Sequence, residues 1–369
     1  MPGIYIHIPF CKHKCTYCDF TSFPDRLNFA EAYMACLYKE IEMRGKQLEK
    51  YTFDTVYIGG GTPSVIDANY IHGAIKQILK CFHLTKNPEI TIEMNPGTVS
   101  EQKIQRYKRA GINRFSIGLQ TAIDEQLENL GRIHNVRDFL YCTSLLKGEN
   151  FSVDVMLGLK GQTKEDVRKT IEVAALSGAS HISMYALTPE DGTPIYTDYL
   201  NGELPDADEV AALYDYGCSL LREKGYSRYE VSNFAKKGFE SKHNLNYWKR
   251  GEYIGLGISA SSFICGKRFT NTFDLDEYMK CILSGFLPVI ESEDVSKEDA
   301  KFEFVMLGLR TVYGISAKAY RDEFGSDWKE DFAKAYEKTR EFLEEVGDIT
   351  RIKDEYLYVQ NQILTEYMN

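Results

Sequence analysis

Short runs of β-branched and aromatic residues alternate with helical patterns through the first half of the chain. The strand-like runs lie at 4–8, 54–58, 89–94, 114–119, 152–157 and 181–186. Between them, helical patterns fall at 28–48, 67–80, 100–110, 136–147 and 164–177. Alternation of this kind predicts a parallel sheet with right-handed crossovers. Because six units are too few to close an eight-stranded barrel, we expect an α/β fold with an open, partial (β/α)6 barrel.

Chemically distinctive residues accompany the predicted strands. Three cysteines follow the first strand, and the segment GGGTPS at 59–64 follows the second. Glu93 ends the third strand, Gln120 follows the fourth, and Asp154 lies within the fifth. Since ligands of open α/β sheets bind at the carboxyl ends of the strands, we expect these residues to contribute to one site.

The pattern changes after Pro194. Residues 206–224 have the pattern of a helix. Two further helical patterns follow at 297–312 and 328–345, and two short predicted strands at 348–352 and 355–359 end the chain. We therefore expect an α+β C-terminal region with a small winged-helix-like module. The predicted boundaries are 1–195 for the barrel, 196–290 for an α+β extension and 291–369 for the C-terminal module.

Charge and hydropathy exclude several classes of protein. The chain has 44 basic and 54 acidic residues and a net charge of −10, which argues against a nucleic-acid partner. It has no apolar run long enough for a transmembrane segment. It also lacks the charged and apolar pattern of a secretory leader, so we expect a cytoplasmic protein whose contacts with membrane proteins are at most transient.

Three of the nine cysteines, Cys11, Cys15 and Cys18, are spaced C-x3-C-x2-C. Each iron of a [4Fe–4S] cluster usually takes one thiolate, so three thiolates would hold a cluster with one open iron. A zinc ion would need a fourth ligand, which His7 or His13 could supply. An odd cysteine count in a cytosolic chain does not suggest a disulfide framework. The cluster is the favoured interpretation, with zinc as the alternative.

The cysteine spacing, with Tyr17 before the last cysteine, resembles the signature of the radical S-adenosylmethionine (SAM) superfamily. The segments IYIHIPFC, YCDF, YIGGGTPS, GLQT and LGRIH resemble its coproporphyrinogen oxidase-like branch, and this resemblance covers nearly the whole chain. It implies that the open iron of the cluster binds the amino and carboxylate groups of SAM.

The resemblance also implies roles for residues along the strand ends. The glycine loop of Gly59, Gly60 and Gly61, continued by Thr62, would meet the amino group of SAM, and Glu93 would bond its ribose or amino acid part. Further positions match SAM-site positions of the family: Tyr5, Gln120, Arg132, Asp154 and Ala186. The structural alternatives are an ordinary strand-to-helix turn for the glycine loop, a solvated carboxylate for Glu93 and a core residue for Tyr5. No residue is predicted to be catalytic.

Two departures separate this chain from the dehydrogenases of the branch. They carry a further cysteine two residues after the third, where this chain has Phe20, and a long segment ahead of the cluster, whereas this chain starts ten residues before Cys11. Both features match the heme chaperones of the branch. Those proteins carry H-N-x-x-Y-W, associated with heme binding, which here spans 243–248. A neutral imidazole binds heme iron well, so His243 is a candidate ligand and His7 a rival; a packed structural histidine is the alternative.

We therefore expect a heme chaperone that passes heme to acceptor hemoproteins such as respiratory enzymes, with three cofactors or ligands: a [4Fe–4S] cluster, SAM and heme. The alternative is an oxygen-independent coproporphyrinogen III dehydrogenase, a decarboxylase that uses the 5′-deoxyadenosyl radical. A zinc-stabilised nucleic-acid-binding protein with a C-terminal wing is a third class. It is disfavoured because the cysteine run supplies only three of the four zinc ligands and the net charge is acidic.

Overall fold

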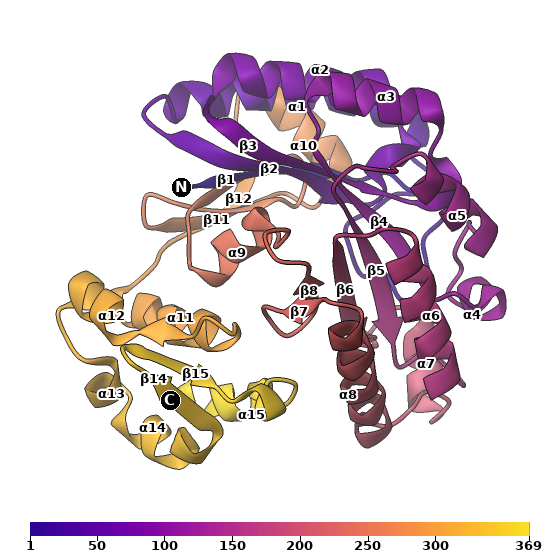
Figure 1. The fold of residues 1–369 in the computed structure, drawn as a ribbon. Coiled ribbons are helices and arrows are strands. Elements are labelled where there is room, and N and C mark those ends of the chain that lie inside the picture. The colour runs from indigo at the N-terminus through magenta and orange to yellow at the C-terminus, as the bar shows by residue number, and fades with distance from the viewer. Residues whose placement is uncertain (369) are drawn as a thin grey trace.

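The computed structural model describes residues 1–368 and is built around one twelve-stranded sheet (Figure 1). Its strand order is β12-β11-β10-β9-β1-β2-β3-β4-β5-β6-β8-β7. The six central strands are parallel and follow one another in chain order: β1 (Gly3–Ile8), β2 (Thr52–Gly60), β3 (His83–Met94), β4 (Arg114–Gln120), β5 (Phe151–Leu157) and β6 (His181–Ala186). All six strands predicted for the parallel sheet are present, and the expected α/β fold is confirmed.

Helices connect these strands, and Figure 1 shows α1, α2 and α3 side by side along the outside of the sheet. The helices of this half are α1 (Ala30–Gln47), α2 (Ala68–Cys81), α3 (Glu101–Ala110), α4 (Asp124–Asn129), α5 (Val136–Ser144), α6 (Lys164–Leu176), α7 (Pro194–Leu200) and α8 (Ala207–Glu223). The apolar residues of these strands are largely buried, as expected for a sheet covered by helices.

Local sequence signals explain where several of these helices begin and end. The Ser100 side chain accepts a hydrogen bond from the Lys103 backbone N–H at the start of α3. The same helix stops at Gly111, whose φ of 98° is readily adopted only by glycine. Asp206 and Glu209 form a reciprocal capping box at the start of α8, the helix predicted at 206–224.

The sheet continues beyond both edges of the six parallel strands. At one edge, β9 pairs in parallel with β1, and an antiparallel ladder of β10, β11 and β12 follows. At the other edge, β8 and then β7 pair antiparallel to β6. These elements are β7 (Ser227–Arg228), β8 (Asn233–Ala235), α9 (Lys242–Trp248), β9 (Tyr253–Leu256), β10 (Ser261–Ile264), β11 (Lys267–Asn271), α10 (Leu275–Leu283) and β12 (Val289–Asp294). Residues predicted as a separate extension therefore share the barrel's sheet; the boundaries 1–195, 196–290 and 291–369 stay a prediction.

The C-terminal residues form a small module with its own apolar core around the fully buried Trp328. A three-stranded antiparallel sheet, in the order β13-β15-β14, packs with short helices. The elements are α11 (Lys297–Leu309), β13 (Ile315–Ser316), α12 (Ala317–Phe324), α13 (Trp328–Asp331), α14 (Ala333–Thr339), β14 (Leu343–Val346), β15 (Ile349–Ile352) and α15 (Gln360–Thr365). The expected α+β C-terminal region is confirmed.

Two details of the predicted module are wrong. The strand predicted at 355–359 is instead a short 3-10 helix, Asp354–Tyr356, because the hairpin forms earlier, around Gly347 and Asp348, and pairs Val346 with Ile349. Gly347 has a φ of 63°, which suits such a two-residue turn. The single helix predicted over 328–345 is broken at Phe332, whose ring packs on Tyr367 in a non-helical backbone conformation.

In the described part of the chain, residues 1–368, no helix has both the length and the apolar character needed to cross a membrane.

A buried carboxylate joins the added strands to the first helix. Glu40 of α1 is fully buried and accepts hydrogen bonds from the Gly257 N–H at 2.7 Å, Asn271 Nδ2 at 2.8 Å and the Tyr278 hydroxyl at 2.7 Å. Burial raises the pKa of Glu40, while the Tyr278 hydrogen bond lowers it. The three donors come from the β9–β10 connection, β11 and α10, so one side chain fixes three later segments against α1.

Glu40→Ala should reduce the free energy of unfolding by about 3 kcal/mol, because it leaves buried donors without a partner. Urea denaturation followed by circular dichroism measures the change. The matched control is Glu42→Ala on the same helix, which removes an exposed pair with Lys46 and should leave the midpoint nearly unchanged. Equal effects of the two substitutions would show that the buried network does not hold the added strands.

Candidate functional site

A cavity of about 390 Å³ lies at the carboxyl ends of the parallel strands. Most of the predicted site residues line it: Cys11, Cys15, Cys18, Gly60, Gly61, Thr62, Glu93, Gln120, Arg132 and Asp154. They come from the loop after β1, the loop after β2, the ends of β3 and β4, the segment after α4, and the middle of β5. The structure thus gathers residues spread over 144 positions of sequence, from Cys11 to Asp154, around one space. We call this space the strand-end cavity.

The cysteine loop is tied to the sheet at both of its ends. The Phe23 N–H donates to the Pro9 carbonyl at 2.7 Å, and His7 Nε2–H donates to the Thr21 carbonyl at 2.8 Å. Inside the loop, the Cys18 N–H donates to the Cys15 carbonyl at 3.2 Å and forms a turn. These bonds hold a short irregular loop against the edge of the cavity.

The three thiols differ in exposure but share one wall of the cavity. Cys11 is buried, with its Sγ 3.6 Å from Thr62 Oγ1, while Cys15 and Cys18 are half-buried. Burial raises the pKa of the Cys11 and Cys18 thiols, so binding of a metal by their thiolates must displace protons and is favoured by higher pH. Among residues 1–368, no group of three or more His, Cys, Asp or Glu side chains is arranged to hold a single metal ion.

The glycine loop is required by close packing. A Cβ added to Gly59 would lie 2.8 Å from Glu93 Oε2, and one added to Gly60 would lie 2.6 Å from the His7 ring. A Cβ on Gly61 would lie 3.0 Å from the Cys11 Sγ and 2.8 Å from the Phe10 carbonyl oxygen. Gly60 also has a φ of 111°. Only glycines allow this loop to lie directly between the cysteine loop and Glu93.

Two carboxyl groups face the cavity from neighbouring regions of the sheet. Glu93 accepts hydrogen bonds from the Tyr57 hydroxyl at 2.7 Å and the Gly60 N–H at 3.2 Å. Burial, with the nearby Asp154 charge, raises the pKa of Glu93 to about 7. Burial also raises the pKa of Asp154 to about 6, although Ser183 lowers it by hydrogen bonding. Both groups are therefore poised to gain or lose a proton near neutral pH.

Arg132 supplies a positive charge beside the cysteine loop. Its guanidinium donates to the Gly118 carbonyl at 3.0 Å and to the Tyr17 hydroxyl at 3.3 Å, and lies 3.6 Å from the Cys15 Sγ. Such a cation stabilises a neighbouring thiolate. The same side chain therefore reaches both the sheet and the cluster-ligand loop.

Gln120 adopts a left-handed backbone conformation, with a φ of 71°, which is uncommon for a residue other than glycine. Its side-chain oxygen accepts a hydrogen bond from the Tyr185 hydroxyl at 2.9 Å. This bond joins the end of β4 to β6 and fixes the amide at the cavity wall.

Several lining residues were not identified from the sequence. They are polar residues at the ends or on the inner face of the parallel strands and their neighbours: Tyr57, Arg114, Ser116, His181, Ser183, Tyr185 and Asn233. Polar side chains at alternating positions of otherwise apolar strands were the available signal, as in the Ser183 and Tyr185 pair of β6.

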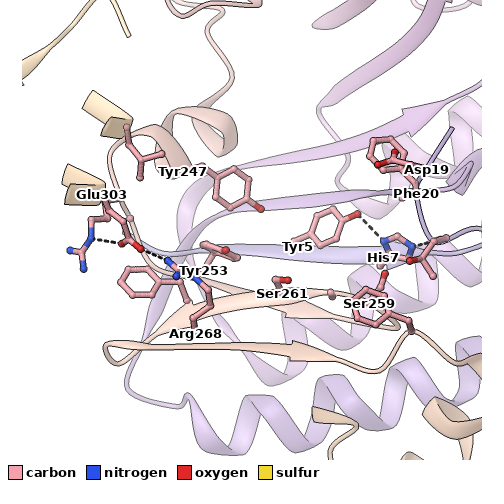
Figure 2. A pocket seen from close by; sticks show the side chains of 18 of the residues that line it. Tyr5, His7, Asp19, Phe20, Tyr247, Tyr253, Ser259, Ser261, Arg268 and Glu303 are labelled. Carbon is pink, nitrogen blue, oxygen red and sulfur yellow. Dashed lines mark hydrogen bonds and ion pairs between the residues drawn. The ribbon is translucent and has the colours of Figure 1, made fainter. Parts of the chain in front are cut away.

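A second, larger cavity of about 710 Å³ adjoins the first (Figure 2). Figure 2 shows His7 and Phe20 at one end, Arg268 and Glu303 at the other, and Tyr5 and Tyr247 between them. Its walls come from β1, the cysteine loop, α9, the β9–β11 ladder and α11. Phe20, Gly60 and Glu93 line both cavities. We call this second space the aromatic cavity.

Three predicted residues lie outside the strand-end cavity. Tyr5 lines the aromatic cavity instead, where its hydroxyl donates to His7 Nδ1 at 3.0 Å. Ala186 is half-buried at the end of β6, paired in register with Leu157, and lines neither cavity. His243 also lines neither.

His243 is buried at the start of α9 and both of its ring nitrogens are paired. Nδ1 lies 2.7 Å from Thr55 Oγ1, and Nε2 lies 2.8 Å from the Tyr247 hydroxyl. Burial, with the Arg114 charge, lowers the pKa of His243 to about 3, so the ring is neutral. This conformation leaves no nitrogen of His243 free for iron. The ring instead positions Tyr247, which does line the aromatic cavity.

The rival histidine is similarly engaged. His7 Nε2–H donates to Thr21 and Nδ1 accepts from Tyr5, so its tautomer is fixed. Burial lowers the pKa of His7 to about 4 despite the Thr21 hydrogen bond. In this conformation His7 acts as a link between β1 and the cysteine loop.

The comparisons with known proteins agree with this arrangement. The model of the Radical SAM superfamily matches residues 5–174, and that of the HemN C-terminal domain matches residues 295–355. Among solved structures, the chain is similar to the coproporphyrinogen III oxidase HemN from Escherichia coli, with a TM-score of 0.88, 17% identity, and coverage of 99% of this chain and 90% of that one. At that identity the likeness shows the fold alone.

Curated relatives are more similar in sequence. The chain is 34% identical to the heme chaperone HemW of Bacillus subtilis, covering 88% of this chain and 87% of the relative. It is 36% identical to that of Haemophilus influenzae, covering 88% and 86%, and 35% identical to that of Escherichia coli, covering 84% and 82%. With similarity of this extent, and cysteine, glycine and carboxylate residues gathered at the strand ends, the chain belongs to the HemW family of the radical SAM superfamily.

Proposed function

We propose that this protein is a cytoplasmic heme chaperone, which binds heme and passes it to acceptor hemoproteins such as respiratory enzymes. The observation that carries the proposal is the pair of adjoining cavities, one lined by cysteines and carboxylates and one lined by aromatic residues. The names of the curated relatives, which match over most of both chains, support the same function.

The strand-end cavity is the proposed site of a [4Fe–4S] cluster held by Cys11, Cys15 and Cys18. When bound, such a cluster supplies a redox-active iron with one open coordination position. The chain's own residues prepare the place: Thr62 lies within hydrogen-bonding distance of the Cys11 sulfur, and Arg132 offsets negative charge on Cys15. The donor set, three thiols on one cavity wall beside a guanidinium, fits a thiolate-bound anionic cluster.

SAM would lie beside the cluster, between the glycine loop and the carboxylates. Gly60 and Gly61 bring backbone groups to the cavity, and Glu93 and Asp154 supply acceptors for the amino and hydroxyl donors of SAM. Gln120 and Arg132 complete the polar wall. Ala186 would lend only shape, and Tyr5 would reach SAM only by leaving its bond with His7.

Heme is an apolar macrocycle with two carboxylates. The aromatic cavity suits such a molecule better than the polar strand-end cavity does. The H-N-x-x-Y-W segment forms α9, and its Asn244 lines the strand-end cavity while its Tyr247 lines the aromatic one. The helix thereby contributes one side chain to each cavity. Binding of iron by His243 would require its ring to release either Thr55 from Nδ1 or Tyr247 from Nε2.

Anaerobically reconstituted protein should contain about four irons and four sulfides per chain, and Cys15→Ala should lose the visible absorbance of the cluster. Iron and sulfide analysis with absorption spectra measures both. Cys265→Ala, which removes an exposed thiol outside the cavity, is the matched control and should keep the cluster. One tightly bound zinc without sulfide would contradict the proposal.

Glu93→Gln and Arg132→Ala should each weaken SAM binding about tenfold, the loss of one charge-assisted hydrogen bond. The readout is the change that SAM causes in the EPR spectrum of the reduced cluster. Since only ionised Glu93 accepts on both oxygens and its pKa is raised to about 7, SAM affinity of the parent protein should fall from pH 8 to pH 6. Glu93→Gln should flatten this dependence.

Glu101→Gln, an exposed change at the start of α3, is the control for that measurement and should keep the parent's affinity and pH profile. Parent-like SAM binding by both Glu93→Gln and Arg132→Ala would show that the strand-end carboxylate and guanidinium do not hold SAM.

The protein should bind heme, transfer it to an apo-hemoprotein, and make no protoporphyrinogen IX from coproporphyrinogen III in the presence of SAM and a reductant. Heme titration, a transfer assay and product analysis measure these outcomes. Decarboxylated product over multiple turnovers would overturn the proposal in favour of the dehydrogenase. His243→Ala should shift or weaken the Soret band, because it removes either an iron ligand or the partner that positions Tyr247. An unchanged band would exclude His243, and His7→Ala would be measured next.

A further inference from the structure

Two arginines share one carboxylate at the end of the aromatic cavity farthest from the cysteine loop. Arg250 Nε lies 2.9 Å from Glu303 Oε2, and Arg268 Nη2 lies 2.5 Å from Glu303 Oε1. All three residues line the cavity, and Figure 2 shows Arg268 and Glu303 joined there. The Glu303 side chain is only 12% exposed, so its charge is largely withdrawn from water.

The arginines keep further N–H groups for a ligand. A guanidinium has five N–H donors, and the remaining ion pairs of Arg250 and Arg268, with Glu323 and Glu293, each engage one terminal nitrogen. Both guanidiniums also lie over the Phe263 ring, at 5.1 Å and 5.9 Å from its centre, which keeps them at the cavity wall.

Arg250 has an unusual backbone conformation. It follows the end of α9 with a φ of 54°, a conformation that glycine commonly adopts after a helix. A side chain at this position carries a conformational cost, and such costs are concentrated at binding sites. The next residue is Gly251, so the chain places its arginine, rather than its glycine, at the strained position.

The wall beside the arginines is largely apolar, while His7, Asp19 and Glu93 line the opposite end. Tyr247, Tyr253, Phe263, Met306 and Leu307 line the cavity next to the arginines, and Phe20 closes the opposite end. The volume of about 710 Å³ lies within the range of about 300–1,000 Å³ typical of sites for compact organic ligands. The cavity therefore fits a flat apolar molecule that carries anionic groups at one edge.

Resting on the proposed heme-chaperone function, we infer that heme lies in the aromatic cavity with its two propionates on Arg250 and Arg268, and that Glu303 competes with those propionates. The guanidiniums bind carboxylates through paired N–H groups, and Glu303 already occupies one such position on each. A competing internal carboxylate weakens heme binding and keeps it reversible, as transfer to an acceptor requires.

A purely structural role makes a different prediction. Glu303 belongs to the C-terminal module, so its ion pairs with Arg250 and Arg268 also join that module to the sheet extension. If the three residues only held the two parts together, removing any of them would affect heme binding in the same direction. Competition requires that removing either arginine weakens heme binding and that removing the Glu303 charge strengthens it.

The test is titration of the full-length protein with hemin, followed by the Soret band, and with iron-free protoporphyrin IX, followed by fluorescence. Arg250→Ala and Arg268→Ala should each raise the Kd about tenfold for both ligands, since both carry propionates. Glu303→Gln should lower the Kd about threefold for both. Arg351→Ala and Glu344→Gln, from an ion pair on the C-terminal sheet, are matched controls and should leave both Kd values unchanged.

Each outcome has one reading. If Glu303→Gln weakens binding as the arginine variants do, the three residues are an interdomain ion network and the inference is overturned. Parent-like Kd values in all three variants place heme elsewhere and also overturn it, while the heme-chaperone function stands. Failure of the parent protein to bind hemin contradicts the proposed function itself. Circular dichroism and urea midpoints are measured for every variant, and Arg250→Lys and Arg268→Lys replace any that fail to fold, with a smaller rise in Kd expected.

Discussion

The register between β1 and β2 is the constraint on which the site depends. It places Gly60 opposite Ile8, and hydrogen bonds from the Gly61 and Thr62 N–H groups to the Ile8 and Phe10 carbonyls continue the pairing beyond the strands. The cysteine loop consequently leaves the sheet directly against the glycine loop. A side chain at Gly60 or Gly61 would force the two loops apart and enlarge the space in which three thiols must hold one cluster.

Much of this half of the molecule is predictable because its signals are local. The six parallel strands are apolar runs, and their order follows the chain, so their carboxyl ends must meet at one edge. The spacing of Cys11, Cys15 and Cys18 is likewise a local pattern. Convergence of Glu93, Gln120 and Asp154 on one cavity then follows from strand order, without any knowledge of side-chain contacts.

The remainder depends on contacts between distant segments, which no local pattern encodes. β9 pairs with β1 across about 250 residues, and the buried Glu40 secures that edge through partners more than 200 positions away. The sequence made His243 a candidate heme ligand with a packed structural histidine as the alternative, and in the structure that ring is buried against Thr55 and hydrogen-bonded to Tyr247. The aromatic cavity was not foreseen because its walls come from both ends of the chain.

The wall formed by Phe20, Gly60 and Glu93 belongs to both cavities, and this has a thermodynamic consequence. A ligand that moves the Phe20 ring, which is 64% exposed, or changes the protonation of Glu93 alters the free energy of binding in the neighbouring cavity. By linkage, the effect is reciprocal: whatever factor one ligand imposes on the affinity of the other is returned in equal measure. A ligand in one cavity would therefore act on the other through this single layer of side chains.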